Sequence, residues 1–210
     1  MIALLDSSEA LSVAESEIGM PVGQLITPLT RFRNRGAKFA IDNGGYSGAN
    51  ADGFMSLLER EYENRSECLF VAVPDVVADA RRTLECFDYW YRKLAGWRLA
   101  FVAQDGIEQL SIPWKLVDAV FIGGSTQWKL SRYAESVIRC AKWQRKWVHV
   151  GRVNSVERFV RFENLGVDSV DGSGISRYSH MRVAIKNRAD SPQLSLLNGN
   201  SYLESMRETK

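Results

Sequence analysis

Residues 148–172 read VHVGRVNSVERFVRFENLGVDSVDG, and this stretch decides the fold. It begins with a short apolar run, Val148–Val150, of the kind that forms a buried strand. A stretch with helical periodicity follows at Ser155–Leu165, and Ser169–Val170 is a second short strand. A strand, a helix and a strand in this order predict a βαβ unit of a parallel sheet.

The helix of this unit has the expected boundaries, with Asn154 as its N-cap and Gly166 just beyond its end. The same alternation recurs earlier in the chain, where four apolar runs end in Gly, Asp, Gln or Pro: Lys38–Ile41, Leu69–Val73, Leu99–Ala103 and Val120–Ile122. Between them we expect helices at Ala51–Glu63, Ala78–Leu94 and Leu130–Trp143. One or two N-terminal strands, around Ile2–Leu5 or Val22–Ile26, bring the pattern close to eight units.

Eight such units predict a compact (β/α)8 TIM-like barrel, and a doubly wound open sheet is the alternative. Polar residues follow almost every strand, which favours the barrel because its rim gathers groups from many strand ends. No GxGxxG or GxxxxGKS fingerprint follows the first strand, so a nucleotide cofactor is not expected. We expect one catalytic domain over residues 1–188 and a polar tail over 189–210 that is mobile or loosely docked.

The composition fits an ordinary packed domain, with 210 residues of which 45% are hydrophobic and 25% charged. No apolar run approaches the roughly 20 residues that cross a bilayer, and no signal peptide is recognisable, so we expect a cytoplasmic protein with no membrane contact. The three cysteines and two histidines are scattered, which predicts neither a disulfide framework nor a metal site.

The charge is unevenly distributed along the chain. The net charge is only +2, yet Gln127–Lys210 contains 15 Lys and Arg against 8 Asp and Glu. Such an excess predicts a positive surface that attracts polyanions, although solvated helix faces would give the same count.

The polar groups at the expected strand ends are candidates for chemistry. Asp42 and Asp171 both lie in glycine-rich turns, where the backbone lets a ligand approach closely. Two acids in different environments can divide the work of breaking a glycosidic bond, one attacking the sugar carbon while the other moves a proton. Either aspartate taken alone is equally typical of an ordinary turn.

Several motifs around these residues resemble those of the tRNA-guanine transglycosylase superfamily. Phe39–Tyr46 resembles the family's TDSGGFQ strand end, and Gly166–Asp171 is similar to its G-[IV]-D-x-F-D segment. Three further landmarks lie between them in the family's order: Val73–Asp75, Val102–Gly106 and Ile122–Ser125. Together the five motifs span well over half of the chain.

The resemblance implies roles for the matching residues. Asp171 would be the nucleophile and Asp42 the general acid and base. Asp75 would accept hydrogen bonds from the guanine edge, while Gln104 and the Gly124 N–H would donate to the exocyclic oxygen. The same base pocket would include Gly123, Gly151 and Tyr46, with Tyr46 stacking on the base or serving as a core aromatic.

The chain also departs from the tRNA enzymes, because it is much shorter and its isolated cysteines cannot form their structural zinc site. It more closely resembles the compact phage-type transglycosylases that insert 7-deazaguanine bases into DNA, also through Thr27–Phe32, Pro74–Asp79 and Phe121–Ser125. The resemblance implies a cofactor-free DNA-guanine transglycosylase that takes a free 7-deazaguanine base, such as 7-cyano-7-deazaguanine, as its second substrate. The alternatives are a tRNA-guanine transglycosylase, a hydrolytic N-glycosidase, a metabolic barrel enzyme that binds phosphate at Gly123-Gly124-Ser125, and a non-catalytic nucleic-acid-binding barrel.

A base inside a duplex cannot reach such a pocket, so the nucleotide must be flipped out or single-stranded while the protein holds its phosphates. The expected nucleic-acid contacts are mostly basic or aromatic and lie in the C-terminal part of the chain. They are Trp128, Lys129, Arg132, Lys142, Arg145, Lys146, Trp147, Arg152, Arg177, His180, Arg182, Lys186 and Arg188. Trp143 also lies among these basic residues, but its helical spacing from Arg139 favours an amphipathic barrel helix.

Overall fold

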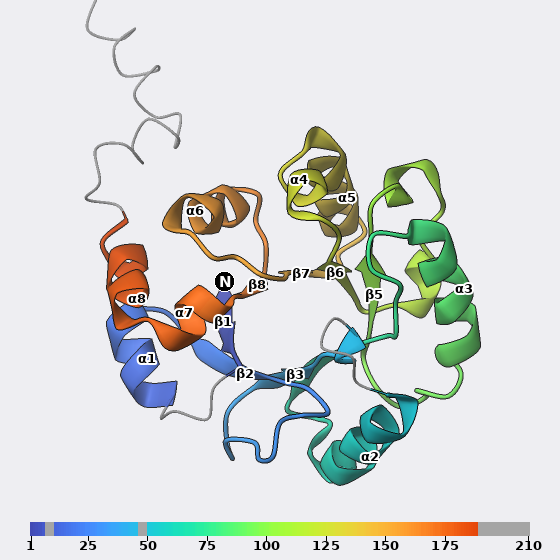
Figure 1. The fold of residues 1–210 in the computed structure, drawn as a ribbon, viewed down its shortest axis with the longest axis horizontal. Coiled ribbons are helices and arrows are strands. Elements are labelled where there is room, and N and C mark those ends of the chain that lie inside the picture. Colours follow the sequence, from blue (N-terminus) through green and yellow to red (C-terminus); the bar gives the residue numbers. More distant parts are fainter. Residues whose placement is uncertain (7–10, 46–49, 189–210) are drawn as a thin grey trace, which may run out of the picture.

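The computed structural model describes residues 1–6, 11–45 and 50–188, and these residues form a closed parallel barrel. Its strands surround a common axis, with the helices on the outside of the ring (Figure 1). In chain order the strands are β1 (Ile2–Leu5), β2 (Val22–Ile26), β3 (Phe39–Ile41), β4 (Cys68–Ala72), β5 (Leu99–Ala103), β6 (Ala119–Ile122), β7 (Trp147–Val150) and β8 (Ser169–Asp171).

The barrel closes between the first and last strands, with Ala3 of β1 beside Val170 of β8. Helices cover the outside of the barrel: α1 (Leu11–Ile18), α2 (Ala51–Glu61), α3 (Ala80–Trp90), α4 (Thr126–Lys129), α5 (Arg132–Trp143), α6 (Val156–Asn164), α7 (Ser173–Arg177) and α8 (Ser179–Lys186). Short 3-10 turns occupy Tyr62–Asn64, Ile107–Gln109 and Trp114–Leu116. The described part of the chain is therefore the compact α/β barrel that the strand–helix alternation predicted, and not an open sheet.

Two apolar layers hold the barrel together. Side chains inside it pack on one another, including Leu4, Leu25, Phe70, Val102 and Phe121. A larger layer lies between the outside of the strands and the helices. Because successive strand residues point to opposite faces, strands buried on both sides are continuously apolar, and this explains their sequence pattern.

The ends of the expected strands and helices lie within four residues of the observed ends. Both N-terminal strands are present, so the barrel is complete at eight. The connection from β2 to β3, residues 27–38, is fully described and contains turns instead of a helix. The position of one N-cap was wrong: Ser155 caps α6 by accepting from the Arg158 N–H, while Asn154 Oδ1 accepts from the Gly174 N–H at 3.0 Å.

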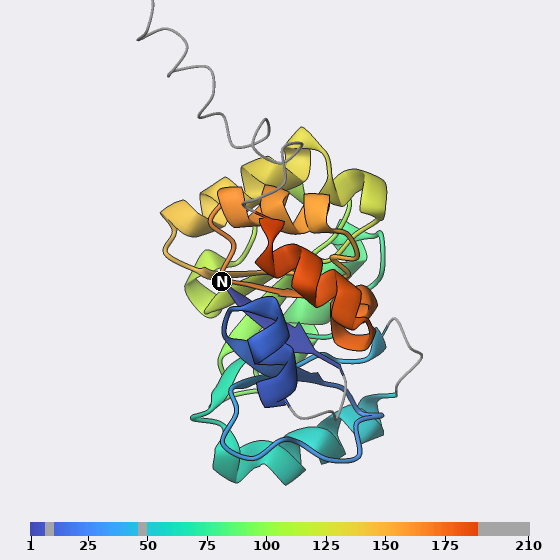
Figure 2. The same ribbon diagram turned by 90° about the vertical axis from the view of Figure 1, so that its left-hand side faces the viewer.

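Two expectations lie outside the described residues, namely the polar tail 189–210 and Tyr46. In the described part of the chain, no helix has the length and apolar character needed to cross a membrane. Helices α1 and α8 lie side by side at the seam of the barrel in both views (Figures 1 and 2).

Candidate active site

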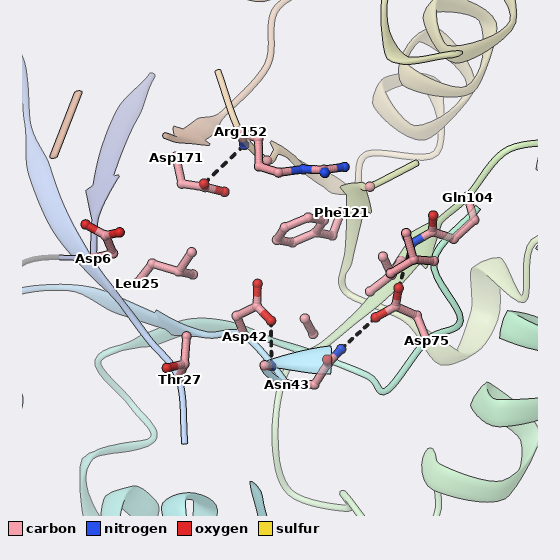
Figure 3. Close-up of a pocket in the computed structure, with 16 residues that line it drawn as sticks. Asp6, Leu25, Thr27, Asp42, Asn43, Asp75, Gln104, Phe121, Arg152 and Asp171 are labelled. Carbon is pink, nitrogen blue, oxygen red and sulfur yellow. Dashed lines mark hydrogen bonds between the residues drawn. The ribbon is translucent and has the colours of Figure 1, made fainter. Parts of the chain in front are cut away.

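A cavity of about 200 Å³ opens at the end of the barrel where the strands terminate. Its floor is apolar, and polar groups from several strand ends surround the opening (Figure 3). The lining residues are Asp6, Leu25, Thr27, Asp42, Asn43, Gly44, Ala72, Asp75, Val77, Val102, Gln104, Phe121, Gly123, Gly151, Arg152 and Asp171. This is the end at which barrel enzymes place their catalytic groups.

Asp42 lies directly after β3 and points into this cavity. Its Oδ1 accepts a hydrogen bond from the Gly44 N–H at 2.8 Å, and Gly44 has a φ of +73°, a backbone conformation that glycine adopts without strain. Burial raises the pKa of Asp42 to about 6, and the nearby carboxylates of Asp171 and Asp75 act in the same direction. A carboxyl group with this pKa can give up and take back a proton near neutral pH.

Asp171 is the last residue of β8 and is held at both carboxylate oxygens. Its Oδ1 accepts from the Arg152 backbone N–H at 3.1 Å, and its Oδ2 bonds to His149 Nε2 at 2.9 Å. The absence of a side chain at Gly151 makes room for this arrangement, since a Cβ there would lie 2.9 Å from the Phe121 ring and 3.2 Å from Asp171 Oδ2.

The two predicted catalytic acids therefore lie in one cavity although 129 positions separate them in sequence. Figure 3 shows their carboxyl groups on opposite sides of the open space, with Leu25 and Phe121 flanking it. A group bound between them would be accessible to an acid on either side, and the arrangement suits a nucleophile paired with a proton donor.

Asp75 follows β4 and is oriented by two side-chain amides. Asn43 Nδ2 donates to its Oδ1 at 2.8 Å, and Gln104 Nε2 donates to its Oδ2 at 2.6 Å. Burial raises the pKa of Asp75, while these amide donors partly offset the increase. The carboxylate is thus fixed in orientation, and its remaining lone pairs are available to a ligand's N–H groups.

The geometry changes the role expected for the glycine pair. The Gly124 N–H donates to Gln104 Oε1 at 2.9 Å, and the Gly123 N–H donates to the Ala103 carbonyl. The expectation that the Gly124 N–H contacts a base is wrong for this arrangement, because Gln104 already occupies that donor. The Gln104 amide has two N–H groups. One donates to Asp75, and the other remains for a ligand.

Arg152 lies between the acids and the rim. Its φ is +61°, which is uncommon for a residue with a side chain and aims its N–H at Asp171. Its guanidinium donates to the Gly124 carbonyl, and its charge acts to lower the pKa of both Asp42 and Asp75. Arg152 therefore supplies positive charge to a cavity lined by four aspartates, Asp6, Asp42, Asp75 and Asp171.

Three of the expected nucleic-acid contacts are wrong because their side chains are buried. Trp128 packs in the core and donates to Glu108, and Lys129 donates to the Gly151 carbonyl at 2.5 Å. Burial lowers the pKa of Lys129 to about 8. Arg182 bonds Glu17 and two backbone carbonyls.

Other expected contacts lie at the far end of the barrel. Lys142 bonds Asp168, which precedes β8, and Lys146 bonds the carbonyl of Val117, which precedes β6. Trp147 is the first residue of β7. Strands of four residues separate this end from the cavity by roughly 10 Å or more, so these groups cannot contact a nucleotide bound there.

Arg177 and His180 follow β8 on the cavity side and are exposed. Between them in sequence, Tyr178 is also exposed, and its ring stacks on the His180 ring with centroids 5.4 Å apart. Arg152, Arg177 and His180 are thus members of the expected nucleic-acid set that lie on the cavity side of the barrel, and Tyr178 was not predicted.

Several residues of the site were not predicted from the sequence. Asn43 lies inside the Phe39–Tyr46 motif, but the resemblance implied no role for its side chain. Thr27 and Phe121 also line the cavity, and His149 contacts Asp171 from below. The sequence does contain a pattern that could have identified His149. Trp147 and His149 are two positions apart on one strand, so their side chains point to the same face of it.

Among residues 1–6, 11–45 and 50–188, no three His, Cys, Asp or Glu side chains are grouped as a metal ion requires. No protein-family model and no curated protein sequence matches the chain. Among solved structures, it is similar to the BexX/CysO complex of Amycolatopsis orientalis, with a TM-score of 0.51 and 12% identity over 97% of this chain and 91% of that one. At this identity the similarity establishes the fold alone.

Proposed function

We propose that the protein is a DNA-guanine transglycosylase that exchanges guanine for a 7-deazaguanine base. The observation that carries the proposal is the position of Asp42 and Asp171 on opposite sides of one cavity, with Asp75 oriented beside them by two amides. The motif order that resembles the transglycosylase superfamily agrees with this placement.

In the first half of the reaction, an Asp171 oxygen attacks C1′ of the target nucleotide as the bond from C1′ to the guanine nitrogen breaks. Asp42 gives its proton to the departing guanine, and the sugar remains as an ester of Asp171. In the second half, the ring nitrogen of the 7-deazaguanine attacks C1′ and releases Asp171. Asp42 then takes the proton of that nitrogen, which returns both acids to their starting states.

The cavity has the size and polarity of a base site. Its 200 Å³ is below the roughly 300–1,000 Å³ of sites for drug-sized ligands, which favours one base over a large cofactor. Asp75 accepts from the ring N–H and exocyclic amine of guanine, and the free N–H of Gln104 donates to the exocyclic oxygen. Adenine has neither a ring N1–H nor an exocyclic oxygen, so it would leave the Asp75 carboxylate and the Gln104 N–H unpaired.

The nucleic acid would be held by exposed groups at the rim. Arg177 can contact phosphates, and the stacked rings of Tyr178 and His180 present an aromatic face to an unpaired base. The target nucleotide must be extruded or single-stranded to enter the cavity.

The phosphate-binding alternative has less support. It needs free backbone N–H groups at Gly123-Gly124-Ser125, but these N–H groups donate to Ala103, Gln104 and Asp105 respectively. Phosphate at this turn would have to break hydrogen bonds that are already formed.

The test is incubation of the protein with a guanine-containing DNA oligonucleotide and 7-cyano-7-deazaguanine, followed by mass spectrometry of the nucleosides. We expect 7-cyano-7-deazaguanine in the DNA with wild-type protein and none with Asp171→Asn. A parallel reaction with tRNA and radiolabelled guanine shows whether DNA or tRNA is the substrate. Incorporation into tRNA and never into DNA would replace the proposal by the tRNA alternative, and an abasic product would indicate a hydrolase.

A further inference from the structure

The geometry points to His149 as a positioning residue that donates its Nε2–H to Asp171 and is held in that tautomer by a hydrogen-bonded chain from Trp147 through Ser169. The contacts are short and consecutive: Trp147 Nε1 to Ser169 Oγ is 2.8 Å, Ser169 Oγ to His149 Nδ1 is 2.9 Å, and His149 Nε2 to Asp171 Oδ2 is 2.9 Å. The functional part of this inference rests on the proposed role of Asp171 as nucleophile.

The chain follows from the positions of four residues on two paired strands. Trp147 and His149 are two positions apart on β7, and Ser169 and Asp171 are two positions apart on β8. Alternate residues of a strand share a face, so both pairs point into the barrel. The strands pair in parallel with His149 opposite Ser169, which sets the serine hydroxyl beside the ring.

The direction of each hydrogen bond follows from the groups involved. An indole N–H can only donate, so the Ser169 oxygen accepts from Trp147. Among the described residues, Ser169 Oγ has hydrogen-bond partners only in Trp147 Nε1 and His149 Nδ1, so its single hydrogen would be buried and unpaired unless it donates to His149 Nδ1. His149 Nδ1 must be unprotonated to accept it. The proton of the neutral ring is therefore on Nε2 and donates to the Asp171 carboxylate.

The imidazole ring and the Asp171 carboxylate are both held in place by their neighbours. His149 and Ser169 are completely buried, and the imidazole packs against Phe121 at 4.5 Å and Phe70 at 5.1 Å between ring centroids. With His149 on Oδ2 and the Arg152 N–H on Oδ1, the carboxylate of Asp171 has one donor on each oxygen and cannot rotate without breaking one of them.

The first test reads the tautomer without any substrate. The chain has only two histidines, so a long-range ¹H–¹⁵N spectrum of ¹⁵N-histidine-labelled protein shows two rings, and His180→Gln identifies the signals of His149. We expect a proton on Nε2 alone in the wild type, and loss of that single state in Ser169→Ala. A ring protonated on Nδ1 alone or on both nitrogens would overturn the inference.

The second test measures the rate of covalent adduct formation with a guanine-containing DNA oligonucleotide in single turnover. His149→Phe keeps an aromatic ring but removes the donor, and we expect the rate to fall about 100-fold with little change in oligonucleotide affinity, as expected when a reacting group is misplaced. His149→Gln, whose amide can still donate to Asp171, should recover at least about 10-fold of the loss. Phe70→Leu is the matched packing control, because it removes a ring that contacts His149 without removing a donor.

The outcomes separate this inference from the proposed function. A wild-type rate in His149→Phe, or an equal loss in Phe70→Leu, would show that the residue only fills space. If the wild type forms no adduct with DNA or tRNA, the proposed function fails, and the tautomer of His149 still decides the structural part of the inference.

Discussion

At the scale of single residues, the two acids of the cavity differ in their neighbours. Asp171 has a hydrogen-bond donor at each oxygen, whereas among the described residues Asp42 accepts from the Gly44 N–H alone and faces two other carboxylates. Environments of this kind separate the properties of chemically identical groups, so that one acid is suited to nucleophilic attack and the other to proton transfer.

Asp42→Asn tests the cost of ionising this acid in the folded protein. Since folding raises the pKa of Asp42 from 3.8 to about 6, its favourable contribution is complete below the unfolded value and is lost as pH rises through about 6. Relative to Asp42→Asn, the wild type should lose on the order of 1–3 kcal/mol of unfolding free energy between pH 4 and pH 7.5. Urea denaturation of both proteins at the two pH values measures this difference. A difference that does not change with pH would contradict it.

Gly151→Ala tests the close packing around Asp171. The new Cβ would meet the Phe121 ring at 2.9 Å and Asp171 Oδ2 at 3.2 Å, so one of them must move. We expect a loss of about 1–3 kcal/mol in stability, as for other overpacked sites, and slower adduct formation. In a Phe121→Leu background, which removes the ring atoms, thermal denaturation should show a smaller cost of Gly151→Ala. Equal costs in both backgrounds would exclude the contact with Phe121 as the cause.

At the scale of elements, the loop after β7 has two neighbouring polar residues with different tasks. Ser155 Oγ caps α6 through the Arg158 N–H at 3.2 Å, while Asn154 Oδ1 accepts from the Gly174 N–H at the start of α7. The first contact stabilises a helix, and the second joins the loops that follow β7 and β8 beside Asp171.

Ser155→Ala should therefore cost about 1 kcal/mol, as is usual for loss of an N-cap. Hydrogen exchange should become faster at the first-turn amides of α6, and Asn154→Ala should instead accelerate exchange at Gly174. If exchange at the start of α6 becomes faster in Asn154→Ala and not in Ser155→Ala, then Asn154 is the N-cap of α6 and Ser155 is not.

At the scale of the whole molecule, the two ends of the described chain meet at the seam of the barrel. Strands β1 and β8 pair there, and outside them Arg182 of α8 bonds Glu17 of α1 at 2.6 Å. Ser179 Oγ donates to the other oxygen of Glu17, and these bonds to Glu17 are responsible for its lowered pKa. The guanidinium of Arg182 also bonds the carbonyls of Ile175 and Ser176, so it joins α1, α7 and α8.

Arg182→Met should weaken this seam without affecting nucleic-acid binding. Removing a buried arginine that is hydrogen-bonded through Nε and Nη1 should cost about 2–4 kcal/mol, which lowers Tm by roughly 5–10 °C in a protein of this size. The salt dependence of oligonucleotide binding should stay unchanged in Arg182→Met and decrease by about one unit of slope in the matched variant Arg177→Gln. If Arg182→Met instead bound DNA more weakly and kept the wild-type Tm, Arg182 would be a phosphate-binding residue after all.

Much of the fold was predictable from the sequence because its signals are local. Val120–Ile122 and Leu99–Ala103 are apolar on both faces, as strands of a parallel barrel must be, and each is followed by polar or glycine residues. The two acids were predicted in the same way, since Asp42 directly follows β3 and Asp171 is the last residue of β8. The helix boundaries were less well predicted, because capping depends on which side-chain oxygen reaches a free N–H.

The alternation of strands and helices, the acids at strand ends and the excess of basic residues can all be recognised in the amino-acid sequence. The three-dimensional arrangement was needed to show which of those basic residues are exposed, that Gln104 accepts from the Gly124 N–H, and that His149 contacts Asp171. These facts depend on how eight strands are placed around one axis, and contacts between residues far apart in sequence have no local pattern that could predict them.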